Sequence, residues 1–412
     1  MAAGSTKTPR IETACFLAVL GIAAALRFWR LEDNGFGSTY YAAAVRSMTE
    51  GARLFFYNAF DPAGFLSIDK PPVAFWIQAA FVALFGYSGW MLHLPQALAG
   101  VASVAILRGL VRRAFGPTAG LLAALLLATT PIAVAVDRSN NADSWLVLFL
   151  LLAASAALRG SGLSLVASMA LLGVAFNVKM LAAFACGPAL LAGWLIASPR
   201  GWSRRLGWMT AAAAVLVAVS LSWSIAYDLT PRDSRPYVSS TSGNSMLELV
   251  VVHNGLQRFD RHLLPTSRLP FETYDAVPVG PLRLAQPMLA GQAGWFLPLA
   301  VLGLVLACRR DSGHASLALW SVWALTYGIV YSAAGGIFHA YYLSTMAPPL
   351  AALAGVSCVE VWRRSLVYLA LGLALCAAWQ IYLAGAAQGW TSAWPAVPLV
   401  ALLAAGASQW RG

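Results

Sequence analysis

The sequence predicts an all-α membrane protein with about twelve membrane-spanning helices. Hydrophobic residues make up 59% of the 412 residues, charged residues make up only 10%, and the mean hydropathy is +0.69. A soluble globular protein would be roughly a quarter charged. Apolar runs close to the ~20 residues that cross a bilayer recur along the whole chain. These observations exclude an ordinary soluble fold.

Two long polar segments, at 32–90 and 228–292, separate the apolar runs into groups. The first segment is too polar at its start to cross the membrane, although it contains helical stretches. We predict spans at residues 12–31, 92–111, 118–136, 143–158, 163–178, 180–198, 206–227, 294–308, 316–334, 341–361, 366–385 and 392–409. We expect residues 1–412 to form a single transmembrane domain without a separate soluble domain.

The charged residues orient these spans. With both termini in the cytoplasm, the short cytoplasmic loops hold the pairs Arg204-Arg205 and Arg309-Arg310, as the positive-inside rule requires. One span more or fewer would place one of these pairs on the wrong side. The acidic residues gather in the two long segments, which therefore face outside. We expect any chemistry on that outer face.

Composition also bears on partners and cofactors. The net charge is +11, but the basic residues lie in short loops between apolar runs, so we expect no nucleic acid as a partner. The five cysteines lie within or beside apolar runs and form no C-x-x-C pair, which supports neither a disulfide framework nor a zinc site. We predict no metal site and no required cofactor.

The first long segment contains two polar patches near the membrane. One runs from Asp33 into a predicted surface helix that begins with Tyr40 and Tyr41. The other holds Asp61, Asp69 and Lys70 among glycines, prolines and aromatic residues, ahead of an apolar helix to about residue 85. Charges near hydrocarbon are costly unless they are paired or functional. A purely structural Asp69–Lys70 ion pair is the alternative.

Further polar residues follow at the outer ends of the spans. They are Arg138, Asn141 and Asp143 between two apolar spans, the single cation Lys179, the amides Asn244 and Asn254 of the second long segment, and His339, Tyr341 and Tyr342. Each has a plain structural reading. Asp143 can cap a helix, Lys179 can extend its amine to the membrane surface, and His339 can belong to an aromatic belt.

Together these side chains fit sugar transfer from a lipid phosphate. Such a reaction needs a carboxylate to accept a proton from the acceptor, and cations to hold the departing phosphate. The outer face supplies acids at positions 61, 69 and 143 and cations at positions 70, 138 and 179. Apolar walls for a lipid tail lie beside them.

Several motifs resemble a known family. In order they are YYAAAVRSM, FDPAGFLSIDKPPVAFW, FGYSGWMLHLPQALAGV, PIAVAVDRSNNADSWLV, GVAFNVKML, DLTPRDSRPYVSSTSGNSMLELVVVHNGLQR and FHAYYLSTMAPPLAALAG. Over about residues 20–360 the chain is similar to GT-C glycosyltransferases of a bacterial branch. That branch is related to protein O-mannosyltransferases and to the lipid A aminoarabinose transferase, of the glycosyltransferase family 39 type.

The resemblance implies a GT-C-like helix bundle in the bacterial inner membrane and a polyprenyl-phosphate sugar as the donor. It implies surface helices at 41–48 and 72–85, an inverting transfer with a carboxylate base, and an acceptor lipid, glycan or protein. Lys70 would face the donor phosphate, Arg138 and Lys179 would assist it, and Asp69 and Asp143 would lie in the same cavity.

The chain departs from the family at one point. Better-known relatives have an Asp-Glu pair just before the first surface helix, where this sequence has Gly37-Ser38. The base is therefore open between Asp69 and Asp61, with Asp33 in reserve. An inactive homologue is one alternative function. A lipid or sugar transporter is another, but transporters hold ionisable groups near the bilayer midplane, whereas these acids lie in loops and at span ends.

Overall fold

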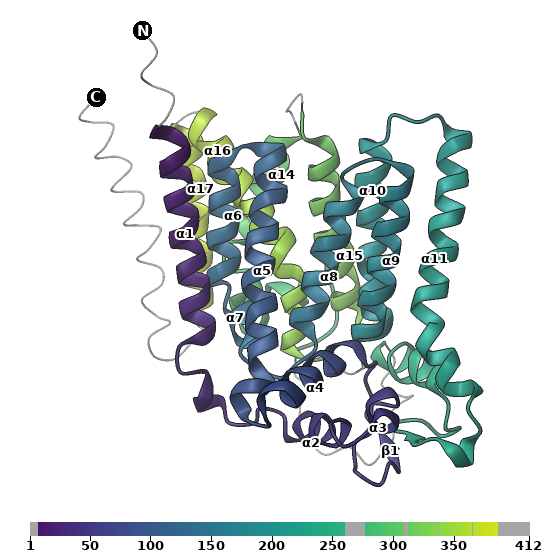
Figure 1. Ribbon diagram of the computed structural model, residues 1–412. Helices are drawn as coiled ribbons and strands as arrows, with labels where there is room; N and C mark the ends of the chain where they lie inside the picture. Colours follow the sequence, from purple (N-terminus) through teal and green to yellow (C-terminus); the bar gives the residue numbers. More distant parts are fainter. Residues whose placement is uncertain (1–6, 260–276, 309–311, 337, 365, 386–412) are drawn as a thin grey trace.

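The computed structural model is a bundle of long helices with a layer of short helices and loops at one end (Figure 1). The structure describes residues 7–259, 277–308, 312–336, 338–364 and 366–385. The α-helices are α1 Lys7–Phe28, α2 Thr39–Met48, α3 Ala52–Phe56, α4 Val73–Phe85, α5 Gly89–Phe115, α6 Pro117–Thr129, α7 Pro131–Asp137, α8 Asp143–Ala157, α9 Gly162–Lys179, α10 Gly187–Ala197, α11 Trp202–Leu229, α12 Met246–Glu248, α13 Pro287–Ala293, α14 Leu297–Ala307, α15 His314–Ala333, α16 Ala347–Arg364 and α17 Leu366–Ala384.

The remaining elements are short. The only strands among the described residues are β1 Leu66–Ser67 and β2 Tyr237–Val238, which pair in parallel. The 3-10 helices are Leu31–Asn34, Met180–Cys186, Arg232–Ser234, Leu256–Arg258, Arg283–Ala285 and Ala340–Met346, and a π-helical turn covers Leu249–His253.

The predicted multi-span membrane fold is confirmed. Eleven of the twelve predicted spans coincide with helices, and the twelfth, 392–409, lies outside the described residues. Within the described part of the chain, seven helices are long and apolar enough to cross a membrane, or eight if the bent pair α6–α7 counts as one span. The number is below eleven because α8 and α14 are short and because spans 163–178 and 180–198 form one apolar stretch, Gly162–Ala197.

Two breaks in the spans bring polar residues to the lower end of the bundle. The bend between α6 and α7 is 62° and occurs at Pro131, which has no N–H to continue the helical hydrogen bonds. At the end of α9 the chain turns sharply at Met180, a buried residue with a φ of 48°. Left-handed backbone at a non-glycine residue costs free energy and often marks a functional position. The turn leaves Lys179 at the helix end.

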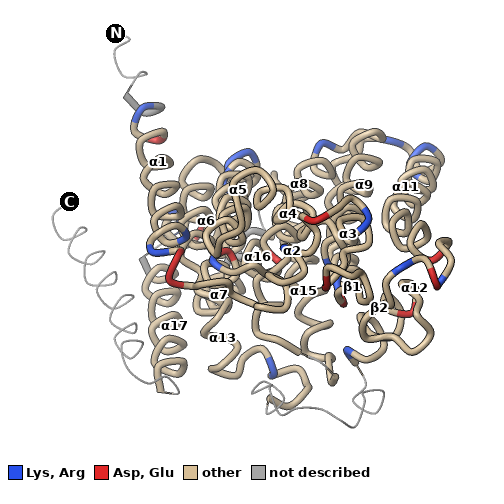
Figure 2. The backbone as a smooth tube through the Cα atoms, turned by 60° about the horizontal axis from the view of Figure 1, so that its bottom comes forward, with Lys and Arg blue, Asp and Glu red and all other residues tan. Residues whose placement is uncertain are grey.

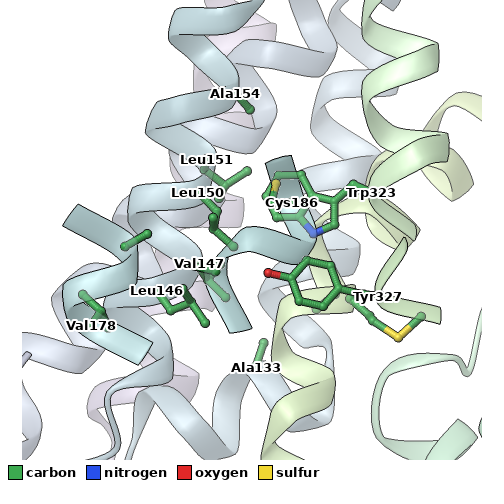
Figure 3. Close-up of a cluster of buried hydrophobic side chains, with 14 of the residues drawn as sticks. Ala133, Leu146, Val147, Leu150, Leu151, Ala154, Val178, Cys186, Trp323 and Tyr327 are labelled. Atoms are coloured by element: carbon green, nitrogen blue, oxygen red, sulfur yellow. The ribbon is translucent and has the colours of Figure 1, made fainter. Parts of the chain in front are cut away.

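The bundle core is built from small and branched apolar side chains. Figure 3 shows part of it, a cluster of buried side chains that includes Leu146, Leu150 and Leu151 of α8 and Trp323 and Tyr327 of α15. The central helix α16 is mostly buried and packs against α6 and α14. This rigid core supports the loops at the lower end.

One buried ion pair ties the first helix to this core. Arg27 of α1 lies 2.8 Å from Asp137 of α7, and both side chains are almost inaccessible to solvent. A Cβ atom at Gly100 of α5 would stand 2.1 Å from the Asp137 carboxylate, so only glycine fits there. Because an unpaired charge in the membrane is expensive, each member of the pair requires the other.

The two long polar segments lie at the same end of the bundle. In Figure 1 the helices α2, α3 and α4 and strand β1 cover the lower end, while the N-terminus lies at the top. The surface helices expected at 41–48 and 72–85 are confirmed as α2 and α4. Figure 2 shows Lys and Arg at helix ends on the opposite rim and also within the layer of loops.

Candidate active site

The two long segments are joined by the short parallel sheet. Leu66 pairs with Tyr237 and Ser67 with Val238, so the end of β1 is fixed against the second segment. Buried Asn58 extends this support, because its side-chain amide donates to the carbonyl of Lys70 at 2.9 Å. The backbone of residues 69–70 is therefore held by both segments.

Asp69 is the acid at the centre of the lower end. Its Oδ2 atom lies 2.5 Å from Lys70 Nζ and 3.8 Å from Nε2 of His253, which comes from the second segment. Burial alone raises the pKa of Asp69, but the neighbouring charge of Lys70 opposes it and holds the pKa below its usual range. The side chain is 20% exposed, so a charged carboxylate remains open to an incoming group.

A second acid–cation pair lies deeper. Lys179, at the end of α9, makes an ion pair and hydrogen bond with Asp143, the first residue of α8. Both side chains are buried, and the amine also lies 4.6 Å from the ring centroid of Tyr341 and 4.3 Å from that of Tyr342. Asp143 therefore neutralises this lysine.

A third cation comes from the second segment. Arg258 donates to the hydroxyl of Tyr342 at 2.7 Å and to Oδ1 of Asn254 at 3.1 Å. Together with Lys70 and Lys179 it lines a cavity of about 200 Å³. The rest of the wall is largely apolar: Leu181, Ala182, Ala185, Val330 and Ala334.

Aromatic residues surround the two ion pairs. Tyr40 stacks on Phe60 with ring centroids 5.0 Å apart, and burial together with the charge of Asp69 raises the pKa of Tyr40 to about 12. His339 stacks on Tyr341 at 4.8 Å. Burial, with the charges of Arg258 and both lysines, lowers the pKa of His339 to about 3, so this ring is neutral at physiological pH.

The structure brings most of the predicted site residues together. Asp69, Lys70, Lys179, Asp143, Asn254, Tyr341 and Tyr342 lie around the cavity or its ion pairs, and His339 stacks beside them. Tyr41 lies close enough for Asp69 and Asp143 to raise its pKa further, although burial is the main cause.

The guanidinium of Arg138 has backbone partners at the end of α1. It donates to the carbonyls of residues 26, 27, 29 and 30 at 2.7–3.3 Å and so closes the end of α1. It is not among the residues that line the cavity.

Four other predicted residues have structural contacts of their own. The carboxylate of Asp61 accepts backbone N–H groups of Phe65 and Leu66 at 2.9–3.1 Å, which organises its loop. Asp33 pairs with Arg30 at 2.5 Å on the surface. The side chain of Asn244 accepts the N–H of Val238 at 2.9 Å, and the backbone N–H of Asn141 donates to Ser139 Oγ at 3.3 Å.

Two central residues, Arg258 and His253, were not singled out from the sequence. Both stand in the motif that ends HNGLQR, in which Gln257 follows His253 by four residues and Arg258 follows Asn254 by four. That spacing was the available signal. Among the described residues no cluster of three or more His, Cys, Asp and Glu could hold a metal ion. The absence of a required cofactor stays a prediction.

The chain is similar in sequence to known proteins. Residues 69–223 match the family described as dolichyl-phosphate-mannose-protein mannosyltransferase. A Bacillus subtilis (strain 168) protein named "Putative mannosyltransferase YycA" is 35% identical over 87% of this chain and 65% of its own length. A second from the same strain, "Putative mannosyltransferase YkcB", is 33% identical over 84% of this chain and 62% of its own. The chain thus spans slightly less than two thirds of each relative.

Two solved structures share the fold. ArnT from Cupriavidus metallidurans bound to undecaprenyl phosphate aligns with a TM-score of 0.62 at 19% identity, over 97% of this chain and 70% of that one. The archaeal oligosaccharyltransferase AglB from Archaeoglobus fulgidus, in complex with an inhibitory peptide and a dolichol-phosphate, aligns with a TM-score of 0.60 at 15% identity, over 97% and 55%. The chain is therefore similar in sequence to the mannosyltransferase family over residues 69–223, and it shares the fold of ArnT and AglB.

Proposed function

We propose that this protein is a membrane glycosyltransferase that moves a hexosyl or pentosyl group from a polyprenyl-phosphate donor to an acceptor on the outer face of the bacterial inner membrane. The observation that supports this most is the cavity that combines three cations with an apolar wall. A lipid-linked sugar has the same two parts, an anionic phosphate and a hydrocarbon tail. The relatives named as mannosyltransferases and the undecaprenyl phosphate of ArnT point the same way.

The charges in the cavity suit a single phosphodiester. Three cations, Lys70, Lys179 and Arg258, face two carboxylates, Asp69 and Asp143, which leaves one positive charge in excess. A phosphate that links a lipid to a sugar has one negative charge. When the bond to the sugar breaks, the phosphate gains a second charge, and fixed cations stabilise that change most in the transition state.

Asp69 is the proposed base. It is ionised, partly exposed and beside the cation that would hold the phosphate. In an inverting transfer the acceptor hydroxyl attacks the anomeric carbon from the side opposite the phosphate, and its proton leaves to the carboxylate. Asp61 and Asp33 remain untested as alternatives, although their carboxylates already have local partners.

We propose that neither a metal nor an organic cofactor takes part. Stabilisation of the leaving phosphate falls to the three side-chain cations. The protein should then retain full transfer in the presence of a chelator. The acceptor is a lipid, glycan or protein of the cell envelope, reached from the loop side of the bundle, with both termini in the cytoplasm.

The test uses the full chain in lipid nanodiscs with a panel of radiolabelled undecaprenyl-phosphate sugars and a bacterial envelope fraction as acceptor. We expect label to move to the acceptor from at least one donor, and Asp69→Asn to abolish this transfer while it still binds undecaprenyl phosphate. Arg46→Gln is the matched control, because Arg46 is an exposed cation of α2 on the same face. A wild-type protein that neither binds undecaprenyl phosphate nor transfers any sugar would contradict the proposal.

A further inference from the structure

His253 approaches the proposed base from the second polar segment. It ends the π-helical turn Leu249–His253, and its side chain is 14% exposed. Its Nε2 atom lies 3.8 Å from Oδ2 of Asp69, on a different segment from Lys70, which contacts the same oxygen. Asp69 thus stands between a lysine and an imidazole. The proposed function gives the imidazole no role.

The other ring nitrogen fixes the tautomer. Nδ1 lies 3.0 Å from Oε1 of Gln257, four residues further along the chain. An amide oxygen can only accept, so Nδ1 must carry the hydrogen, as this hydrogen-bond network assigns it. In the neutral ring, Nε2 then has no hydrogen and offers its lone pair toward Asp69.

We propose that His253 is the final proton acceptor of the transfer and acts through Asp69, with Gln257 as the residue that holds its tautomer. This inference rests on the proposed function. The acceptor oxygen forms a bond to the anomeric carbon, the bond from that carbon to the phosphate oxygen breaks, and its electron pair stays on the phosphate. The acceptor proton passes to the Asp69 carboxylate and on to Nε2.

The charges explain why a second proton acceptor is needed. A protonated Asp69 would remove one of the two carboxylates that balance the three cations Lys70, Lys179 and Arg258. Passing the proton to His253 restores the carboxylate and places it between two cations. The low pKa of Asp69 agrees with this, because such a carboxylate holds a proton weakly.

The distance of 3.8 Å between Nε2 of His253 and Oδ2 of Asp69 is less than 1 Å longer than a hydrogen bond. Catalytic hydrogen bonds are often long in unliganded proteins and shorten when substrate binds. One water molecule between the two groups would serve equally, because water can accept from one and donate to the other. A change of the Asp69 rotamer would also bring Oδ2 within hydrogen-bond distance of Nε2. Such a change is possible once Lys70 turns toward the donor phosphate.

The experiment measures kcat and donor affinity for wild type, His253→Gln and His253→Ala in nanodiscs, with and without added imidazole. We expect kcat to fall about 100-fold in both variants, as general acid–base groups typically contribute. Donor affinity should change less than about threefold, since His253 does not line the cavity. Imidazole should restore part of the kcat of His253→Ala.

Two further variants sharpen the test. Gln257→Leu removes the hydrogen-bond acceptor for Nδ1 of His253, and we expect an intermediate loss of kcat. Gln257→Glu keeps an acceptor at this position, so we expect its kcat to stay near that of the wild type. His314→Ala is the control, because His314 is an exposed histidine that starts α15 at the opposite end of the bundle. It should show wild-type kcat and no response to imidazole.

The outcomes separate this inference from the proposed function. Wild-type kcat in both His253 variants, with an inactive Asp69→Asn, would overturn the role of His253 and leave the transferase intact. A loss of kcat without imidazole rescue, together with weaker donor binding, would assign His253 a structural role and also overturn it. A wild-type protein with neither donor binding nor transfer would remove both proposals.

Discussion

The charge balance of the cavity yields a prediction that does not depend on the sugar. Lys70→Gln removes a cation and leaves Asp69 to repel the donor phosphate, so the excess positive charge falls to zero. Asp69→Asn removes the competing carboxylate and raises the excess to two. The double variant returns the balance to that of the wild type.

The size of the effect follows from the separations. Two unit charges ~4 Å apart interact by about 4 kcal/mol at an effective dielectric constant of ~20. Asp69 is 20% exposed and Lys70 11%, so solvent screens part of this. We therefore expect about 2 kcal/mol, or roughly 30-fold weaker binding of undecaprenyl phosphate to Lys70→Gln. Asp69→Asn should bind at least as tightly as wild type, and the double variant should recover most of the loss.

The assay measures the affinity of undecaprenyl phosphate for the protein in nanodiscs at fixed ionic strength, by competition with a fluorescent analogue. Arg46→Gln controls for a change in the total charge of the same face. The order of affinities tests the reasoning. If Asp69→Asn weakens binding as much as Lys70→Gln does, then the carboxylate supports the phosphate site instead of competing with it, and the charge argument is refuted.

Three other predictions concern topology, stability and the alternative acid. Maleimide added from outside should label Ser240→Cys and spare Ser203→Cys, and labelling in the reverse order would invert the membrane orientation. Arg27→Gln should lower the free energy of unfolding by about 3–5 kcal/mol, because it leaves Asp137 buried and unpaired. The double variant Arg27→Met with Asp137→Leu should lower that free energy by less, because no buried charge remains. Equal thermal unfolding of all variants in detergent would argue against a buried pair. Asp61→Asn should lower stability by about 1 kcal/mol, because the Asp61 carboxylate accepts backbone N–H groups of its own loop. We expect kcat to stay nearly unchanged. A loss of kcat above about 100-fold would return Asp61 to the role of base.

The fold could be predicted because each span leaves its own mark on the sequence. An apolar run and its flanking arginines are local signals, and they placed α5, α9 and α11 to within a few residues. The bend at Pro131 has a local cause as well, yet span 118–136 was predicted as one helix. A proline alone does not say whether a span bends or ends, because the neighbouring helices decide which arrangement packs.

The site was predictable only in part, because its contacts join residues far apart in the chain. Lys70 stood out because a charge near hydrocarbon needs a reason. Arg138 stood out for the same reason, and its actual partner is the end of α1, which no local pattern reveals. Arg258 sits in a polar loop where a basic residue is ordinary. Only the fold brings it to Tyr342 and the cavity.

The two acid–cation pairs also explain how such a cavity can exist without its donor. A lysine held away from water loses hydration energy that only a nearby anion restores. Asp69 and Asp143 supply that anion for Lys70 and Lys179, which holds both amines in place. A donor phosphate would then compete with these carboxylates, rather than with water, for the two lysine amines. As negative charge grows on the leaving phosphate, Lys70 would follow it and release Asp69, so that the base is freed at the stage of the reaction that needs it.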